Sequence, residues 1–349
     1  MILEKIKKKI IPLDEFINLC LYQYKDSYYQ KKINFGYRGD FVTSPHISSI
    51  FSEMLAIWII TFWSKINKPN KLNILELGPG DGTMAYDILD CLKKIKSFNA
   101  EINYHLLETS ANLTIVQKKK LQKYQNIHWI KNLTNFKKKN LIIISNEFFD
   151  ALPIKQVIKK NNIWYEKYVF FNNKKKIIQI QLVKANKFLM SKIKEIYDLN
   201  KNTLIEFPTC LNSVIKKLSC SLKMENSIFI TIDYGENSEI CNDTLQAIHR
   251  NKKSNFLKNI GDSDITYQVN FYHLIKLFEK NKLHVNGFLN QSQFLQSLGI
   301  KERLIQATKN LPEKQKVQYE KSVKRLIHPL HMGDLFKVLI VSNKNNKSI

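Results

Sequence analysis

The chain has 349 residues, of which 44% are hydrophobic and 11% aromatic, and its 55 Lys and Arg residues against 30 Asp and Glu residues give a formal net charge of +25. This composition excludes an intrinsically disordered chain, and the length allows a large core in two domains or in one domain with an insertion. No apolar run approaches the roughly 20 residues of a membrane span, so we expect a soluble globular protein without one.

Predicted helices and strands alternate in the first half of the chain. Apolar residues recur at helical spacing over residues 13–30, and Thr43 or Ser44, with Pro45 in the first turn, begins a predicted helix that runs to residue 64. Further along we expect strands at 72–78, 102–108, 127–130 and 141–145 and helices at 83–96 and 111–123. This alternation predicts an α/β fold with a mostly parallel, doubly wound sheet covered on both faces.

The second half is less regular. The pattern predicts an antiparallel insertion and then a return to the parallel sheet. In chain order we expect strands at 155–160, 164–171 and 175–183, a parallel-type strand at 227–233, a loop at 242–268, a helix at 269–280, a helical region at 291–325 and a closing strand at 334–341.

A glycine-rich loop joins the first parallel strand to the next helix. Gly78, Gly80 and Gly82 allow positive φ and close approach of a ligand, and the helix N-terminus suits a ligand carboxylate. The loop is neither a P-loop, which needs Gly-Lys-Ser/Thr, nor the GxGxxG of nicotinamide and flavin enzymes. Glu76 before it, and Glu108 at the next strand end, where it could accept ribose hydroxyls, favour S-adenosylmethionine. The alternative is an ordinary glycine-rich turn beside a surface glutamate.

A second polar cluster follows the fourth strand. Asn146, Glu147 and Asp150 surround Phe148 and Phe149 at the sheet edge beside the glycine loop. Methyl transfer is an in-line displacement in which the catalyst mainly positions the acceptor. An amide and carboxylates can hold an amine or guanidinium and take up its proton, and aromatic rings can shelter a cation. The alternative is a capped loop whose two phenylalanines fill the core.

Other candidate residues have simpler alternatives. Residues 39–45, which include Asp40, Thr43 and Ser44, could be only a helix-capping loop, and residues 233–235 only a turn. Neither the histidines nor the five cysteines show ligand spacing, so we predict no metal site and reduced thiols.

The positive charge is weak evidence for a nucleic-acid partner. Arg occurs only at positions 38, 250, 303 and 325, whereas nucleic-acid-binding proteins favour Arg for bidentate contacts. We therefore interpret the lysine runs as solvated surface, with an acidic partner as the alternative. The N-terminus has no signal peptide or presequence pattern, which predicts a bacterial cytoplasmic protein, with the mitochondrial matrix as the alternative.

Taken in order, the motifs resemble those of the MidA-like family of S-adenosylmethionine-dependent methyltransferases. The matching segments are GDFVTSP (39–45), ELGPG (76–80), NEFFDALP (146–153), IDYG (232–235), DTLQ (243–246), DIT (264–266) and MGDLFKV (332–338). The resemblance spans about residues 5–341, and NEFFDALP and GDFVTSP are its most specific parts.

The resemblance implies a class I, Rossmann-like methyltransferase fold with an inserted β/helical substrate region. The implied organisation is an N-terminal helical segment with a lid loop (1–66), the first part of the cofactor-binding core (67–155), the insertion (156–225), the rest of the core with a helical insertion (226–342) and a disordered tail (343–349). The family's mitochondrial branch implies symmetric dimethylation of an arginine on the large quinone-side subunit of NADH dehydrogenase.

Residues of this chain can be matched to the family's functional positions. Glu76, Gly78, Gly80, Gly82 and Glu108 match cofactor-binding positions. The active-site loop is matched by Asn146, Glu147 and Asp150, and a segment that resembles a lid over the cofactor by Asp40, Thr43 and Ser44.

Four positions depart from the family pattern. His46 stands where the family usually has Glu, and Asp81 where it has Arg, so a positive charge is expected to be lost near the site. Asn251 replaces an expected His and Asn270 an expected Asp. These departures leave three hypotheses: a protein arginine methyltransferase, a non-catalytic assembly factor that keeps the fold, and an RNA methyltransferase that uses a lysine-rich face. The oligomeric state is not predicted.

Overall fold

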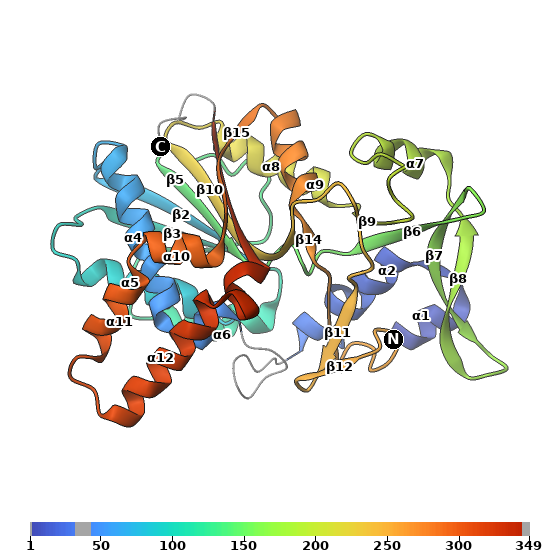
Figure 1. The fold of residues 1–349 in the computed structure, drawn as a ribbon, viewed down its shortest axis with the longest axis horizontal. Coiled ribbons are helices and arrows are strands. Elements are labelled where there is room, and N and C mark those ends of the chain that lie inside the picture. Colours follow the sequence, from blue (N-terminus) through green and yellow to red (C-terminus); the bar gives the residue numbers. More distant parts are fainter. Residues whose placement is uncertain (1, 32–42, 344–349) are drawn as a thin grey trace.

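The computed structural model describes residues 2–31 and 43–343, which form two lobes (Figure 1). One lobe is built on an eight-stranded sheet and the other on a five-stranded sheet, and a three-stranded sheet lies near the centre. Asp40, most of the predicted lid loop and residues 344–349 of the predicted tail lie outside the described residues.

The larger sheet confirms the predicted parallel architecture. Its strand order is β15-β16-β10-β5-β2-β3-β4, with β14 paired to the end of β10. Within this sheet β4, β3, β2, β5 and β10 run parallel, whereas β16 is antiparallel to both of its neighbours. The chain winds outward from β2 in both directions, so the carboxyl ends of β2 and β5 flank the point where open α/β sheets bind ligands. The strands are β2 (Lys71–Leu77), β3 (Glu101–Leu107), β4 (Ile127–Ile130), β5 (Leu141–Asn146), β10 (Ser227–Glu236), β14 (Val269–Asn270), β15 (Leu283–Asn290) and β16 (Phe336–Asn343).

Helices cover both faces of this sheet because its central strands are apolar on both sides. In β2, Ile74 packs in one core with α4 and α5, and Leu75 packs in a second core with α8 and α9. Helix α8 lies inside the predicted insertion, yet it packs on the core sheet. The helices are α4 (Ser49–Lys65), α5 (Thr83–Lys94), α6 (Ala111–Leu121), α8 (Leu211–Leu222) and α9 (Phe271–Lys280).

The predicted continuous helix from Thr43 or Ser44 to residue 64 is wrong in one respect. It is divided into α3 (Ser44–Ile47) and α4 at Ser48, whose backbone is extended with φ −159° and ψ 132°. The Ser48 side chain accepts a hydrogen bond from the backbone N–H of Ile50 at 3.3 Å and so caps the longer helix. The break allows α3 to turn toward the glycine loop.

The second lobe joins the N-terminus to the predicted antiparallel insertion. Its strand order is β1-β7-β6-β9, with β8 on the other edge of β7. The N-terminal strand pairs antiparallel with β7, so that Ile11 lies opposite Val169. Strands β6, β7 and β8 are the three predicted strands, and β9 was not predicted. The elements of this lobe are α1 (Ile2–Lys8), β1 (Ile11–Pro12), α2 (Leu13–Asn18), β6 (Ile154–Lys160), β7 (Ile163–Asn172), β8 (Ile177–Lys184), α7 (Lys187–Lys194) and β9 (Leu204–Pro208).

The predicted helix over residues 13–30 is also wrong in its second part. Helix α2 passes into a π-helical segment (Leu19–Gln23) and stops at Tyr24, which is extended. Ser27 closes the following turn, because its hydroxyl accepts from the backbone N–H of Tyr24 at 2.8 Å and donates to the carbonyl of Leu19 at 2.6 Å. A short 3-10 turn (Tyr28–Gln30) follows and brings its side chains back toward the π-helical segment.

The region predicted as a loop at 242–268 contains the central three-stranded sheet. It comprises β11 (Gln246–His249), β12 (Lys252–Ser254) and β13 (Asp264–Thr266), which are too short to give a clear sequence pattern. The predicted helical region at 291–325 is three helices, because Gly299, with φ +83°, and Pro312 interrupt it. They are α10 (Gln291–Ser297), α11 (Ile300–Thr308) and α12 (Glu313–Ile327).

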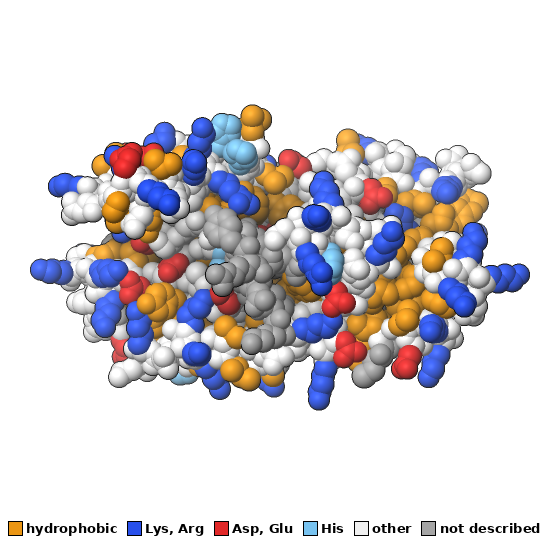
Figure 2. Space-filling model, turned by 90° about the horizontal axis from the view of Figure 1, so that it is seen from below, with side chains coloured by type: hydrophobic (Ala, Val, Ile, Leu, Met, Phe, Trp, Pro, Cys, Tyr) orange, Lys and Arg blue, Asp and Glu red, His pale blue; other side chains and the backbone are white. Residues whose placement is uncertain are grey.

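The face of the molecule in Figure 2 shows Lys and Arg side chains scattered among acidic, apolar and uncharged ones. This dispersal agrees with the interpretation of the lysines on this face as solvated surface. Across residues 2–31 and 43–343, we find no helix with the length and apolar character needed to cross a bilayer.

Candidate functional site

A cavity of about 870 Å³ opens at the carboxyl ends of β2, β3, β5 and β10. Its other side is formed by residues of the N-terminal segment and of β11 and β13. Gly82 and Ser44 do not line it, and Asp40 lies outside the described residues. The predicted site residues that line it are Thr43, Glu76, Gly78, Gly80, Glu108, Asn146, Glu147 and Asp150.

The glycine loop has the conformation that the sequence predicted. Gly78 has φ +63°, and a Cβ atom there would lie 3.0 Å from Cδ2 of Phe148. Gly82 has φ +81° and stands at the start of α5. Both positions favour glycine because of their positive φ, and Gly78, which lines the cavity, exposes its backbone to a ligand there.

Glu76 is a buried carboxylate at the end of β2. Only 1% of it is exposed, and it accepts a hydrogen bond from the hydroxyl of Tyr104 at 2.6 Å. Burial raises the pKa of Glu76 to about 7, although the bond from Tyr104 works against this rise. A cationic group of a ligand beside Glu76 would favour its ionised form.

Glu108 is held in place at the end of β3. One of its oxygens accepts from the backbone N–H of Ser110 at 2.7 Å, and the other accepts from Nε2 of Gln117 at 3.0 Å. The same Nε2 donates to the carbonyl of Gly80 at 2.7 Å, and Oε1 of Gln117 accepts from the indole N–H of Trp129 at 2.9 Å. Gln117 thus ties the glycine loop to Glu108. Sequence reasoning missed this residue, although an uncharged polar residue within a lysine-rich helix was a usable signal.

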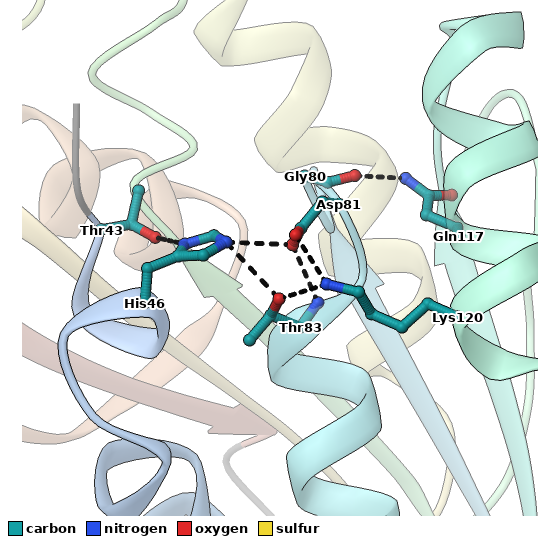
Figure 3. Close-up of polar contacts among 7 residues, drawn as sticks. All are labelled: Thr43, His46, Gly80, Asp81, Thr83, Gln117 and Lys120. Atoms are coloured by element: carbon teal, nitrogen blue, oxygen red, sulfur yellow. Dashed lines mark hydrogen bonds and ion pairs between the residues drawn. The ribbon is translucent and has the colours of Figure 1, made fainter. Parts of the chain in front are cut away.

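Asp81 is the centre of a polar network that includes two of the departures from the family pattern (Figure 3). Its Oδ1 lies 3.2 Å from Nε2 of His46 in α3, and its Oδ2 lies 2.6 Å from Nζ of Lys120 in α6. Thr43 bonds the other ring nitrogen of His46 at 2.7 Å. The network therefore joins α3, the glycine loop and α6.

The expected loss of positive charge at Asp81 is compensated by Lys120. Burial alone would raise the pKa of Asp81, but the hydrogen bonds and charges of His46 and Lys120 outweigh burial and hold this pKa well below its usual range. Asp81 also accepts from the backbone N–H of Thr83 at 3.0 Å. One of the helix-start N–H groups predicted to face a ligand carboxylate is therefore already engaged.

The loop after β5 carries the second predicted cluster. Glu147 has φ +51°, a conformation that is uncommon outside glycine and often marks functional sites. Its Oε1 accepts from Nδ2 of Asn146 at 3.0 Å and from the backbone N–H of Ser44 at 3.3 Å. Among the described residues, Oδ1 of Asn146 has no partner. Phe149 fills the core, as the alternative proposed, whereas Phe148 lines the cavity.

Asp233 holds this loop from beneath. Its Oδ2 accepts backbone N–H groups of Phe148, Phe149 and Asp150 at 3.1, 3.0 and 3.4 Å, and its Oδ1 accepts that of Tyr234 at 3.0 Å. Asp233 is fully buried. The sequence suggested only a turn here, but the residue fixes the direction of the loop after β5.

Three buried or partly buried carboxylates lie together here: Glu147 and Asp150 in the loop and Asp233 in β10. Burial raises the pKa of Glu147 to about 7 and that of Asp233 to about 8. Burial, followed by the charges of Asp233 and Glu147, raises the pKa of Asp150 well above its usual range. No described Lys or Arg lies within ion-pair distance of these three groups, and Oδ1 of Asp150 has no described partner. Such a cluster suits a cationic ligand.

The other two positions that depart from the family pattern, Asn251 and Asn270, do not line the cavity. Asn270 caps α9, because its Oδ1 accepts from the backbone N–H of His273 at 3.0 Å. Asn251 lies in the turn between β11 and β12 with φ +60°. Within the part of the chain that the structure describes, no group of three or more His, Cys, Asp or Glu side chains could hold a metal ion.

Known proteins resemble this chain over most of its length. Residues 54–289 match the family described as S-adenosyl-L-methionine-dependent methyltransferases. The Drosophila melanogaster protein named protein arginine methyltransferase NDUFAF7 homolog, mitochondrial, is 28% identical over 94% of this chain and 80% of its own length. The Homo sapiens protein named protein arginine methyltransferase NDUFAF7, mitochondrial, is 27% identical over 93% of this chain and 78% of its own length.

A solved structure shares the fold. A Burkholderia thailandensis protein bound to S-adenosyl-homocysteine has a TM-score of 0.83 at 22% identity, and the match covers 96% of this chain and 88% of that one. This likeness confirms the predicted fold class. The family match confirms S-adenosylmethionine as the cofactor, and the glycine loop with Glu76 and Glu108 fits it.

The raised pKa of Glu147 predicts a pH-dependent effect on stability. Its folded-state pKa of about 7 lies above the ordinary 4.5. The stability that it contributes is therefore fully present below about pH 4.5 and is lost as the pH rises through 7. From about pH 5 to about pH 8, we expect the free energy of unfolding of the wild type to fall by about 2–3 kcal/mol relative to that of Glu147→Gln.

Urea unfolding of both proteins at the two pH values measures this change. Burial lowers the pKa of His105 to about 4 and that of His273 to about 3, so these groups act in the opposite direction. They are common to both proteins and cancel in the difference. A difference in unfolding free energy that does not change with pH would contradict the assignment.

The contact between His46 and Asp81 predicts energetic coupling. In a double-mutant cycle with His46→Ala and Asp81→Ala, we expect an interaction free energy of about 0.5–3 kcal/mol in unfolding, because each change removes the same contact. Asp90→Ala is the matched control, since Asp90 lies on α5 but pairs with Lys94 and Lys123 instead. Additive effects of His46→Ala and Asp81→Ala would show that the contact is not formed in solution.

Proposed function

Because the chain belongs to the family of S-adenosyl-L-methionine-dependent methyltransferases, we propose that it methylates an arginine side chain of a protein. The observation that carries this acceptor is the cluster of Glu147, Asp150 and Asp233 beside the glycine loop, since buried carboxylates favour a cationic partner. The names of the relatives, which are 27–28% identical, support the same acceptor.

Our proposal assigns the cofactor to the half of the cavity formed by β2 and β3. When bound, S-adenosylmethionine supplies a methyl group on a positively charged sulfur. The carboxylate of Glu108 accepts hydrogen bonds from the ribose hydroxyls, and Glu76 faces the amino group. The backbone at Gly78 and Gly80 admits the cofactor closely, whereas Gly82 at the start of α5 and Thr43 and Ser44 at the start of α3 support this half of the site. The proposed cofactor-binding role of Asp40 rests on the family resemblance alone, because this residue lies outside the described residues.

The proposed roles of the loop after β5 concern the acceptor. A guanidinium presents five N–H donors and no acceptor, so its partners must be oxygen atoms. Glu147 and Asp150 supply carboxylate oxygens, and the unpartnered Oδ1 of Asn146 supplies an amide oxygen. A guanidinium nitrogen that gains a methyl group must lose one proton. Glu147 can accept this proton, because its pKa of about 7 lies near neutral pH.

The resemblance extends the proposal to a particular substrate. We propose symmetric dimethylation of an arginine on the large quinone-side subunit of NADH dehydrogenase, in support of the assembly of that complex. The proposed compartment is the bacterial cytoplasm, and the mitochondrial matrix is the alternative that the names of the relatives favour. An RNA methyltransferase would need a continuous basic groove, whereas on the face in Figure 2 the basic side chains are dispersed.

Two variants separate the cofactor half from the acceptor half. Glu108→Ala should weaken binding of S-adenosylmethionine about 10–100-fold in calorimetric titration, because it removes charge-assisted hydrogen bonds. Glu147→Gln should leave this affinity unchanged and lower methyl transfer by about 10²-fold or more, because it removes a proton acceptor. Transfer is measured by mass spectrometry of methylarginine peptides from cells that carry each variant.

A control variant and two outcomes that would contradict the proposal complete this test. Glu225→Gln alters an exposed glutamate that pairs with Lys139, and it should change neither quantity. If the folded protein bound neither S-adenosylmethionine nor S-adenosylhomocysteine, the non-catalytic assembly factor would replace the enzyme hypothesis. If methylation depended on this protein but fell on lysine, the arginine acceptor would be wrong.

A further inference from the structure

Two stacked tyrosines form part of the cavity wall beside the loop after β5. The rings of Tyr22 and Tyr29 lie 5.4 Å apart at an interplanar angle of 15°, and both residues line the cavity. The π-helical segment and the turn closed by Ser27 bring them together. Neither residue belongs to the sheet that binds the cofactor, so this wall comes from the second lobe.

Hydrogen bonds fix both rings. The hydroxyl of Tyr29 donates to Oδ1 of Asp264 in β13 at 2.9 Å, and the hydroxyl of Tyr22 donates to the carbonyl of Ala151 at 2.8 Å. Asp264 lines the cavity and is 5% exposed. Burial raises the pKa of both tyrosines well above its usual range, so that they stay neutral donors.

The tyrosine wall and the carboxylate loop are joined into one site. Besides the bond from Tyr22 to Ala151, the backbone N–H of Tyr267, just after β13, donates to the carbonyl of Asp150 at 3.1 Å. Burial is the main cause of the raised pKa of Glu147 and of Asp150, and the charge of Asp264 adds to both shifts. A side chain that enters the cavity would therefore have carboxylates and fixed aromatic rings around it.

This combination distinguishes one kind of cation from another. A guanidinium is planar, weakly hydrated and stacks on aromatic faces, whereas an ammonium is a compact and strongly hydrated charge. Carboxylates alone attract both cations. The aromatic contribution favours the planar cation and grows when water is excluded.

We propose that Tyr22, Tyr29 and Asp264 form the specificity wall of the acceptor site, which selects an arginine side chain over a lysine side chain. The proposal rests on the proposed function, because it needs an acceptor beside the bound cofactor. It adds two residues of the second lobe, Tyr22 and Tyr29, that contact the acceptor, and Asp264 from the three-stranded sheet supports them. The role of Asp264 is to orient Tyr29 through their hydrogen bond and to add negative charge to the site.

The test uses the full chain saturated with S-adenosylhomocysteine. Three probes are titrated and followed by calorimetry: Nα-acetyl-arginine N-methylamide and its lysine and citrulline counterparts. Citrulline has the shape of arginine without the charge. We expect the arginine probe to bind about tenfold or more tightly than either counterpart. Equal binding of the arginine and lysine probes would overturn the proposal.

Variants then assign this selectivity to the wall. Tyr29→Leu and Asp264→Asn should each weaken the arginine probe about tenfold and reduce its advantage over lysine. Tyr29→Phe keeps the aromatic ring and should therefore lose less affinity for the arginine probe than Tyr29→Leu. Tyr24→Phe and Asp262→Asn are matched controls, because neither residue lines the cavity, and Asp262 is an exposed partner of Lys31.

The outcomes separate this proposal from the proposed function. Unchanged affinity for S-adenosylhomocysteine shows that each variant is folded, and if Tyr29→Leu fails this check, Tyr29→Phe and Asp264→Asn carry the test. If every wall variant still bound the arginine probe selectively, the proposed role of the wall would be wrong and the proposed function would be unaffected. Failure of the wild type to bind S-adenosylhomocysteine would instead contradict the proposed function.

Discussion

Carboxylates buried at one edge of a parallel sheet are the constraint on which this site depends. Strands β2, β5 and β10 end side by side, and each brings an acidic residue there: Glu76, Glu147 and Asp233. A buried carboxylate must be hydrogen-bonded or protonated, because an uncompensated charge costs several kcal/mol. Asp233 meets this requirement with four backbone N–H groups, and in doing so it fixes the loop that carries Asp150. Satisfying one buried acid thus positions another whose Oδ1 has no described partner.

Side chains of helices α3 and α6 hold the glycine loop in place beside the strand ends. Gln117 joins the glycine loop to Glu108, and the network of Asp81 joins the glycine loop to α3. Two departures from the family pattern, His46 and Asp81, are the two partners of one contact. Considered separately, each is the loss of an expected residue. Considered together, they form an alternative pair that, with Lys120, keeps the glycine loop tied to its neighbours.

The sequence was sufficient where the position of a residue follows from a strand and its end. Glu76, Glu108 and Asn146 could be placed together because the carboxyl ends of parallel strands meet at one edge. The tyrosine wall could not be predicted, because the apolar spacing of residues 13–30 suggested one helix, and a serine hydroxyl at Ser27 ends it. The place of Asp264 in the cavity wall could not be predicted for another reason. It lies in a strand of three residues, whose position depends on pairing with β11 rather than on local pattern.

Repulsion among the buried carboxylates lowers the stability of the folded protein, but the same negative charges can bind a cationic acceptor. In the absence of a cation, the raised pKa values of Glu147, Asp150 and Asp233 mean that protons reduce the negative charge of the cluster. In the proposed function, the guanidinium of the acceptor replaces those protons, because an adjacent positive charge lowers carboxylate pKa values. The ionised cluster that we propose then holds the cation more strongly and offers an oxygen for the proton that methylation releases. A carboxyl group whose pKa burial raises can therefore be neutral in the empty site and ionised beside the proposed cationic acceptor.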